Sequence, residues 1–162
     1  MLSESVKKAW RDHTRVNGEL LEHLEPEMLK AQTPGGGYSV AQHLAHLTAS
    51  TKSWGTYFDK AHLGELPDLF EDGADDDDTE AFIVETDLER VREVMSDTHR
   101  VVLEAAEKAQ DKGDLPHTSL DAYLIHMMVH NAHHRGQIML ALKTSGYTLP
   151  GDDAIWGPWR GA

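Results

Sequence analysis

The segment 126–137 concentrates residues that can bind a metal ion. It has the periodicity of a long helix and contains four of the chain's eleven histidines: His126, His130, His133 and His134. At about 3.6 residues per turn, His130 and His134 lie roughly 40° apart around the helix axis and one turn apart along it. Two imidazoles in this arrangement can bind one metal ion together. A third ligand has to come from elsewhere in the chain, and the pair His43 and His46 offers one.

The apolar stripe of this expected helix separates the four histidines. The stripe runs through Leu120, Leu124, Met127, Asn131, His134, Ile138 and Leu142. His134 falls near its centre and His130 on its inward side, so we expect both to be buried. His126 and His133 lie towards its edge and are expected at the surface or beside the site. Because buried imidazoles need partners, the inner pair either binds a metal or is hydrogen-bonded in a polar core.

Other residues on the expected inner faces bear on the kind of site. His13 and Asn17 lie on the core stripe of the first helical pattern, where they either line a wet pocket or face a groove at the end of the bundle. Gly136 costs about 1 kcal/mol relative to alanine inside a helix, which indicates the close approach of a neighbouring helix or a ligand. Asn131 follows His130, where a His-Glu-x-x-His peptidase has its general base. A zincin-type peptidase is therefore excluded.

Composition limits the class of protein. A length of 162 residues suits a single domain, 1–162, and the formal net charge of −13 argues against nucleic-acid binding. No apolar run approaches the roughly 20 residues that cross a bilayer, and the start of the chain lacks a signal-peptide pattern. We therefore expect a cytoplasmic protein that is not attached to a membrane. There is no cysteine, so any thiol chemistry needs a thiol that arrives with a substrate.

Four long helical patterns are legible, and no strand pattern competes with them. They cover roughly 3–24, 39–58, 86–112 and 119–144, with Ser39 as the expected N-cap of the second. The tail 149–159 is expected to pack across the bundle. The stretch 67–79, with aspartates at 75–78, is expected to be a solvated loop, with a calcium site as the weaker alternative. The economical architecture is an all-α four-helix bundle.

Three stretches of the sequence also resemble a known family. The run 38–47 (Tyr-Ser-Val-Ala-Gln-His-Leu-Ala-His-Leu) and the run 130–138 (His-Asn-Ala-His-His-Arg-Gly-Gln-Ile) resemble motifs of the DinB/YfiT superfamily of metalloenzymes, as does the closing Gly-Tyr-Thr-Leu-Pro at 146–150. The resemblance implies a four-helix bundle of up-down-down-up topology that is often a homodimer. It also implies a metal held by one histidine of helix two and two of helix four. Nickel and zinc are the expected metals, and iron and manganese are the alternatives.

Carried over by position, the resemblance implies that His46, His130 and His134 bind the metal. The helix-four pair is also the pair that the apolar stripe selects. On helix two the family's ligand follows a Trp-Ser/Thr-Val start by eight residues, which leads to His46, although Tyr38 replaces that tryptophan here. Helical periodicity alone places His43 nearer to the apolar stripe. The family spacing favours His46 over His43.

Three imidazoles leave one coordination position open, which is typical of reactive rather than structural sites. The superfamily includes S-transferases that use low-molecular-weight thiols such as bacillithiol or mycothiol, and a thiol-dependent maleylpyruvate isomerase. The resemblance therefore implies a metal-dependent enzyme of this S-transferase type, acting on a small-molecule substrate. The alternatives are a metal-dependent hydrolase, a metal-binding module without turnover, and a hydrogen-bonded histidine core without metal. The sequence does not identify a general base.

Overall fold

The chain folds into helices. The structure, a computed structural model, describes residues 1–70 and 83–161. Its elements are α1 (Glu4–His23), the 3-10 helix η1 (Pro26–Lys30), α2 (Val40–Gly55), α3 (Lys60–Leu63), α4 (Leu88–Lys108), α5 (Leu120–Thr144) and α6 (Asp152–Arg160). The described residues form no strand and only two isolated β-bridges, Gln32–Ser39 and Phe70–Val84. The prediction of an all-α fold is confirmed.

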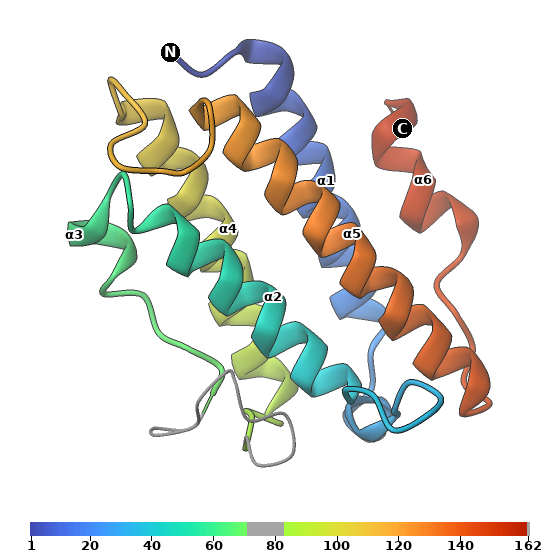
Figure 1. Cartoon of the computed structure of the whole chain (residues 1–162). Helices are drawn as coiled ribbons and strands as arrows, with labels where there is room; N and C mark the ends of the chain where they lie inside the picture. Colours follow the sequence, from blue (N-terminus) through green and yellow to red (C-terminus); the bar gives the residue numbers. More distant parts are fainter. Residues whose placement is uncertain (71–82, 162) are drawn as a thin grey trace.

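The four long helices lie side by side in two layers (Figure 1). α2 and α5 are neighbours in the front layer, with α4 behind α2 and α1 behind α5. α2 packs on both α4 and α5, and α1 packs on both as well. α1 and α5 run in one direction along the bundle, and α2 and α4 run in the other (Figure 1). The motifs on α2 and α5 are therefore on adjacent helices.

The starts of the long helices are fixed by side-chain caps. Ser3, Ser39 and Ser119 each accept a hydrogen bond from a backbone N–H in the first turn of α1, α2 and α5, and Asp87 does the same for α4. At α2 the cap is reciprocal, because the side chain of Gln42 also accepts from the backbone N–H of Ser39. The expected N-cap of the second helix is therefore confirmed.

Two helix ends differ from the sequence prediction. α2 ends at Gly55 rather than near residue 58, and α4 ends at Lys108 rather than at 112. At Gly55 the chain turns against the short helix α3, where an added Cβ would lie 2.5 Å from Cδ1 of Leu63. After α4, Ala109 adopts an extended conformation with ψ of 131°, which stops the helix.

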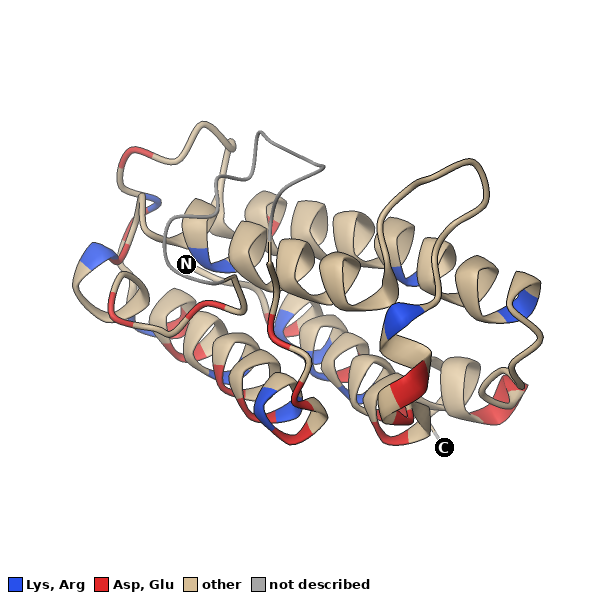
Figure 2. Ribbon diagram, turned by 90° about the horizontal axis from the view of Figure 1, so that it is seen from below, with Lys and Arg blue, Asp and Glu red and all other residues tan. Residues whose placement is uncertain are grey.

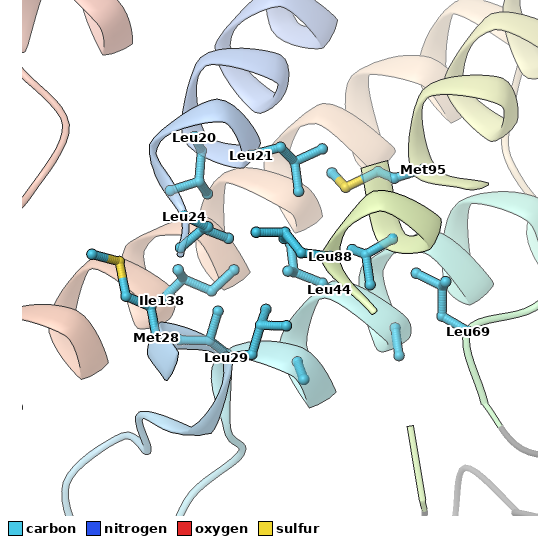
Figure 3. Packing of buried hydrophobic residues seen from close by; sticks show 14 of the residues in the cluster. Leu20, Leu21, Leu24, Met28, Leu29, Leu44, Leu69, Leu88, Met95 and Ile138 are labelled. Atoms are coloured by element: carbon cyan, nitrogen blue, oxygen red, sulfur yellow. The ribbon is translucent and has the colours of Figure 1, made fainter. Parts of the chain in front are cut away.

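The apolar core is divided into two clusters by a layer of buried polar residues. One cluster, around Leu24, Leu44 and Ile138, fills the end of the bundle near η1 (Figure 3). The other contains Trp10 and Tyr123 and fills the opposite end. Each long helix has buried polar residues between the two clusters, and the most buried of them are His13, Asn17, Thr48, Thr51, Thr98, His99 and Asn131. We call this set the polar layer.

The remaining segments cover the outside of the bundle. α6 packs on α1, as expected for the tail, but through Gly157 and Pro158, while Trp156 and Trp159 are exposed. Of the stretch 67–79 that was expected to be a loop, the acidic run lies outside the described residues. Among the described helices, none is long and apolar enough to cross a membrane.

Candidate metal centre

Three histidines from two helices come together in the front layer. His46 of α2 and His130 and His134 of α5 each offer a ring nitrogen, and these three nitrogens lie within 4.8 Å of one another. Among the described residues, no other group of three or more potential ligands lies close enough together to hold a metal ion. The structure thus brings together the three residues that the sequence predicted as ligands.

The spacing of the rings suits a shared ion. The Nε2 atoms of His130 and His134 are 3.2 Å apart, and the two ring centroids are 4.6 Å apart. The ring of His46 lies 4.7 Å from that of His134 and 5.3 Å from that of His130. Ligand nitrogens at about 2.1 Å from a tetrahedral zinc ion are roughly 3.4 Å apart, so small rotations of the side chains would suffice. His134 is buried, and the other two are half-buried.

Local structure positions each of these rings. His130 and His134 are one helical turn apart on α5, which places them on the same side of that helix. His46 lies in the second turn of α2, just after the reciprocal cap made by Ser39 and Gln42. The backbone N–H of Val40 also donates to the carbonyl of Ala31, which anchors the start of α2 to the preceding loop.

The electrostatics of the site favour a neutral ring at His134. Burial lowers the pKa of His134 to about 3, and the neighbouring His130, His46 and His43 add to the effect. Neutral imidazole is the form that binds a metal, because the lone pair must be available. The group contains no carboxylate, so a divalent ion bound to it would keep its full charge. Such a centre would favour an anion in its open position, for example a thiolate or hydroxide.

His43 lies behind the three histidines rather than among them. It is buried, and its Nδ1 is 2.9 Å from Nδ1 of His134. Its ring packs against that of Tyr38, with centroids 5.3 Å apart. Helical periodicity was therefore informative about burial, since His43 is more deeply buried than His46. Periodicity did not predict which of the two joins the group, because the ring nitrogen that lies close to those of His130 and His134 belongs to His46.

The other two histidines of α5 are exposed. His126 pairs with His117 from the preceding loop, with Nδ1 and Nε2 2.7 Å apart, beside the ring of Trp54. His133 lies against His134, with ring centroids 5.2 Å apart. Neither belongs to the group of three.

The polar layer lies deeper in the bundle than the three histidines. Asn17 donates from Nδ2 to Oδ1 of Asn131 at 3.4 Å, and Asn131 donates to Oγ1 of Thr51 at 3.3 Å. Nη1 of Arg135 donates to Oδ1 of Asn17 at 2.6 Å, and His99 donates from Nδ1 to the carbonyl of Met95 at 2.8 Å. Asn131 and Arg135 are on α5 beside the ligand candidates, so the layer helps to fix the rotation of that helix.

The structure corrects one sequence-based expectation about this region and adds one residue to it. His13 and Asn17 do not face a groove at the end of the bundle, because they are buried in the polar layer at its middle, where Asn17 contacts Nε2 of His13 at 3.1 Å. His99 was missed, although it lies one turn after Met95 on the inner face of α4. Gly136 does not allow a close approach within the chain, since an added Cβ would meet none of the described atoms within 4 Å.

A hollow in the surface adjoins the candidate centre at Ser50. The hydroxyl of Ser50 is 3.5 Å from Nε2 of His46. The same serine lines a cavity of about 580 Å³ with Trp54, Tyr57 and Phe70. Lys52, also in its wall, pairs with Asp68. The cavity has room for a small molecule and offers both hydroxyl and aromatic groups.

A helical bundle in which two adjacent helices present three converging histidines defines a protein with a potential three-histidine metal centre. The chain belongs to the DinB family, whose family model matches residues 3–160. The comparisons with curated proteins and with solved structures gave no match.

Proposed function

We propose that this DinB-family chain binds a divalent transition metal through His46, His130 and His134. The observation that carries the proposal is the convergence of their three ring nitrogens within 4.8 Å, in a setting that keeps His134 neutral. Imidazole ligands suit nickel and zinc, and iron and manganese are the alternatives. Three protein ligands leave a position open for a substrate.

The activity that we propose is transfer of a low-molecular-weight thiol to a small electrophilic substrate. A bound metal would favour the thiolate form of the cosubstrate. Its sulfur then displaces a leaving group from the electrophilic carbon, while the thiol proton passes to solvent. The chain has no cysteine, so the sulfur must come from the cosubstrate. The hydroxyl of Ser50, 3.5 Å from Nε2 of His46, is a hydrogen-bonding group between these histidines and the cavity that would receive the substrate.

Metal analysis of untagged protein tests the binding proposal. We expect about one transition-metal ion per chain in the wild type. His46→Ala, His130→Ala and His134→Ala should each lose it, whereas the matched control His126→Ala, on the same helix, should keep it. Metal-free wild-type protein whose stability is unchanged by added nickel or zinc would refute the proposal.

Activity assays separate the enzymatic options. Conjugation of monobromobimane or chlorodinitrobenzene with several low-molecular-weight thiols should be faster with the metal-loaded protein than with the chelator-stripped protein. If no thiol gives a rate above the stripped control, the transferase proposal fails. Metal-dependent cleavage of ester substrates would then identify a hydrolase, and its absence would identify a binding module.

We further propose that the chain forms a homodimer through the exposed face of α5. Ile125, Val129 and Leu140 are 47%, 64% and 43% exposed there, and the small residues Ala132 and Gly136 lie between them. We call these five residues the α5 stripe. A second copy is the partner that suits this stripe, because an uncharged surface on a chain of net charge −13 can meet itself without repulsion. Figure 2 shows how few charged residues α2 and α5 carry compared with α1 and α4.

A further inference from the structure

We propose that His43 is a positioning residue that holds His134 in the tautomer able to bind metal. In this arrangement Nδ1 of His43 accepts a hydrogen bond from Nδ1–H of His134, and the Nε2 lone pair of His134 is left for the metal. The inference rests on the proposed function of His46, His130 and His134 as ligands.

The two nitrogens of His134 face different neighbours. Nε2 lies 3.2 Å from Nε2 of His130, on the side where the ligand nitrogens converge. Nδ1 lies 2.9 Å from Nδ1 of His43, on the buried side. The nitrogen that would bind the metal is therefore Nε2, and the nitrogen left over for a supporting contact is Nδ1.

A single proton between the two Nδ1 atoms decides whether His134 can act as a ligand. Between two neutral imidazoles, one Nδ1 must donate and the other must accept. If His134 donates, its Nε2 carries a lone pair and can bind a metal. If His43 donates, the proton of His134 is on Nε2 and blocks binding. The hydrogen bond made by one ring nitrogen thus sets the function of the other.

Within the described part of the chain, the surroundings of His43 provide one polar contact for its Nδ1, the contact with Nδ1 of His134. The side chain is 5% exposed, and its ring is held between Tyr38 and His134. In the described part of the chain, its Nε2 is buried without a hydrogen-bond partner. The contact with His134 is therefore the polar interaction that the structure provides for this ring. A metal-binding histidine usually donates its other ring N–H to an acceptor behind it, and Nδ1 of His43 is the acceptor that the structure places behind His134.

Two substitutions of His43 separate positioning from packing. Asparagine places an amide oxygen as many bonds from Cβ as Nδ1 is in histidine, so His43→Asn keeps an acceptor for Nδ1–H of His134. Leucine fills similar space without any acceptor, so His43→Leu leaves that proton buried and unpaired. Loss of such a supporting partner typically weakens metal binding about 10- to 100-fold.

The experiment measures the dissociation constants of zinc and cobalt(II) by chelator competition, and records the visible spectrum of the cobalt(II) form. We expect His43→Leu to bind about 10- to 100-fold more weakly with an altered cobalt spectrum, and His43→Asn to stay within a few-fold of wild type. Circular dichroism checks that both variants fold. His133→Leu, which removes an exposed histidine that also lies against His134, is the matched control and should bind as wild type does.

Three outcomes would overturn the inference. Wild-type affinity in His43→Leu would show that the contact does not matter. Loss of the metal in His43→Asn, with retention in His46→Ala, would make His43 itself a ligand. Failure of the wild type to bind either metal would refute the proposed function, and the inference with it, whereas the first two outcomes leave a metal-binding protein in place.

Discussion

At the scale of single residues, burial has different consequences for the histidines of this chain. Burial lowers the pKa of His134, so its ring is neutral and a ring nitrogen keeps the lone pair that a metal needs. This ring also lies next to other potential ligands. His13 and His99 are buried in the polar layer and do not belong to the group of three. Burial lowers the pKa of both, helped for His13 by the nearby His99 and Arg135. These two rings therefore bear on stability rather than on binding.

The stability of the metal-free protein should fall as the pH drops below about 6.5, the usual pKa of histidine in an unfolded chain. Below that pH the unfolded chain takes up protons that the buried rings of His13 and His99 do not, so protonation favours unfolding. Each such group contributes a slope of about 1.4 kcal/mol per pH unit until its folded-state pKa is reached. Urea denaturation at pH 7.5, 6.5 and 5.5 in the presence of chelator measures the slope.

His13→Gln should reduce that slope between pH 6.5 and 5.5, because it removes one buried titrating group and keeps an acceptor for Asn17. Thr98→Val, at a buried residue of the polar layer that carries no titrating group, is the control and should leave the slope unchanged. An unaltered slope in His13→Gln would show that His13 does not contribute.

The sequence predicted the candidate ligands unequally. His130 and His134 follow from periodicity, because residues four apart must share a helix face. The choice between His43 and His46 does not, because it depends on how α2 is rotated against α5, and periodicity leaves that angle open. Two partners of Asn17 in the polar layer, His99 of α4 and Asn131 of α5, could not be predicted for the same reason.

At the scale of elements, side-chain caps fix the helix starts, and the cap at Ser39 was predicted from the sequence. The ends of α2 and α4 were predicted less well, because they depend on what the chain packs against next, as Gly55 does against Leu63. The two capped helices of the candidate centre differ in one respect. Ser39 caps α2 within seven residues of His46, whereas Ser119 caps α5 eleven residues before His130.

Removing either cap should destabilise the protein, but only one should weaken metal binding. Ser39→Ala and Ser119→Ala should each lower the free energy of unfolding by about 1 kcal/mol. Fraying of α2 would move His46, so Ser39→Ala should also raise the dissociation constant for zinc. Ser119→Ala is the matched control, because its helix start is three turns from His130. Equal zinc affinities for the two variants would show that the start of α2 does not position the centre.

At the scale of the whole molecule, charged residues are distributed unevenly between the two layers of the bundle. α1 and α4 carry salt bridges such as Arg11–Glu107 and Arg100–Glu104 on their outer surfaces. α2 and α5 carry few charged residues (Figure 2), and the candidate centre is on these two helices. The same layer of the bundle therefore carries the three histidines, Ser50 of the cavity wall and the α5 stripe.

Val129→Glu should convert the proposed dimer into monomers. In a two-fold symmetric contact between α5 stripes, each substitution appears twice, so two carboxylates would be buried near each other. Like charges juxtaposed in an interface cost several kcal/mol, which corresponds to a dissociation constant raised roughly 100-fold or more. Sedimentation velocity over a range of concentrations measures the change. Trp156→Glu, at a side chain of α6 that is 51% exposed, is the control for a lost surface hydrophobic and should remain dimeric. A dimer that survives Val129→Glu but dissociates in Trp156→Glu would place the contact on α6, and a wild type that is monomeric at all concentrations would refute the proposed homodimer.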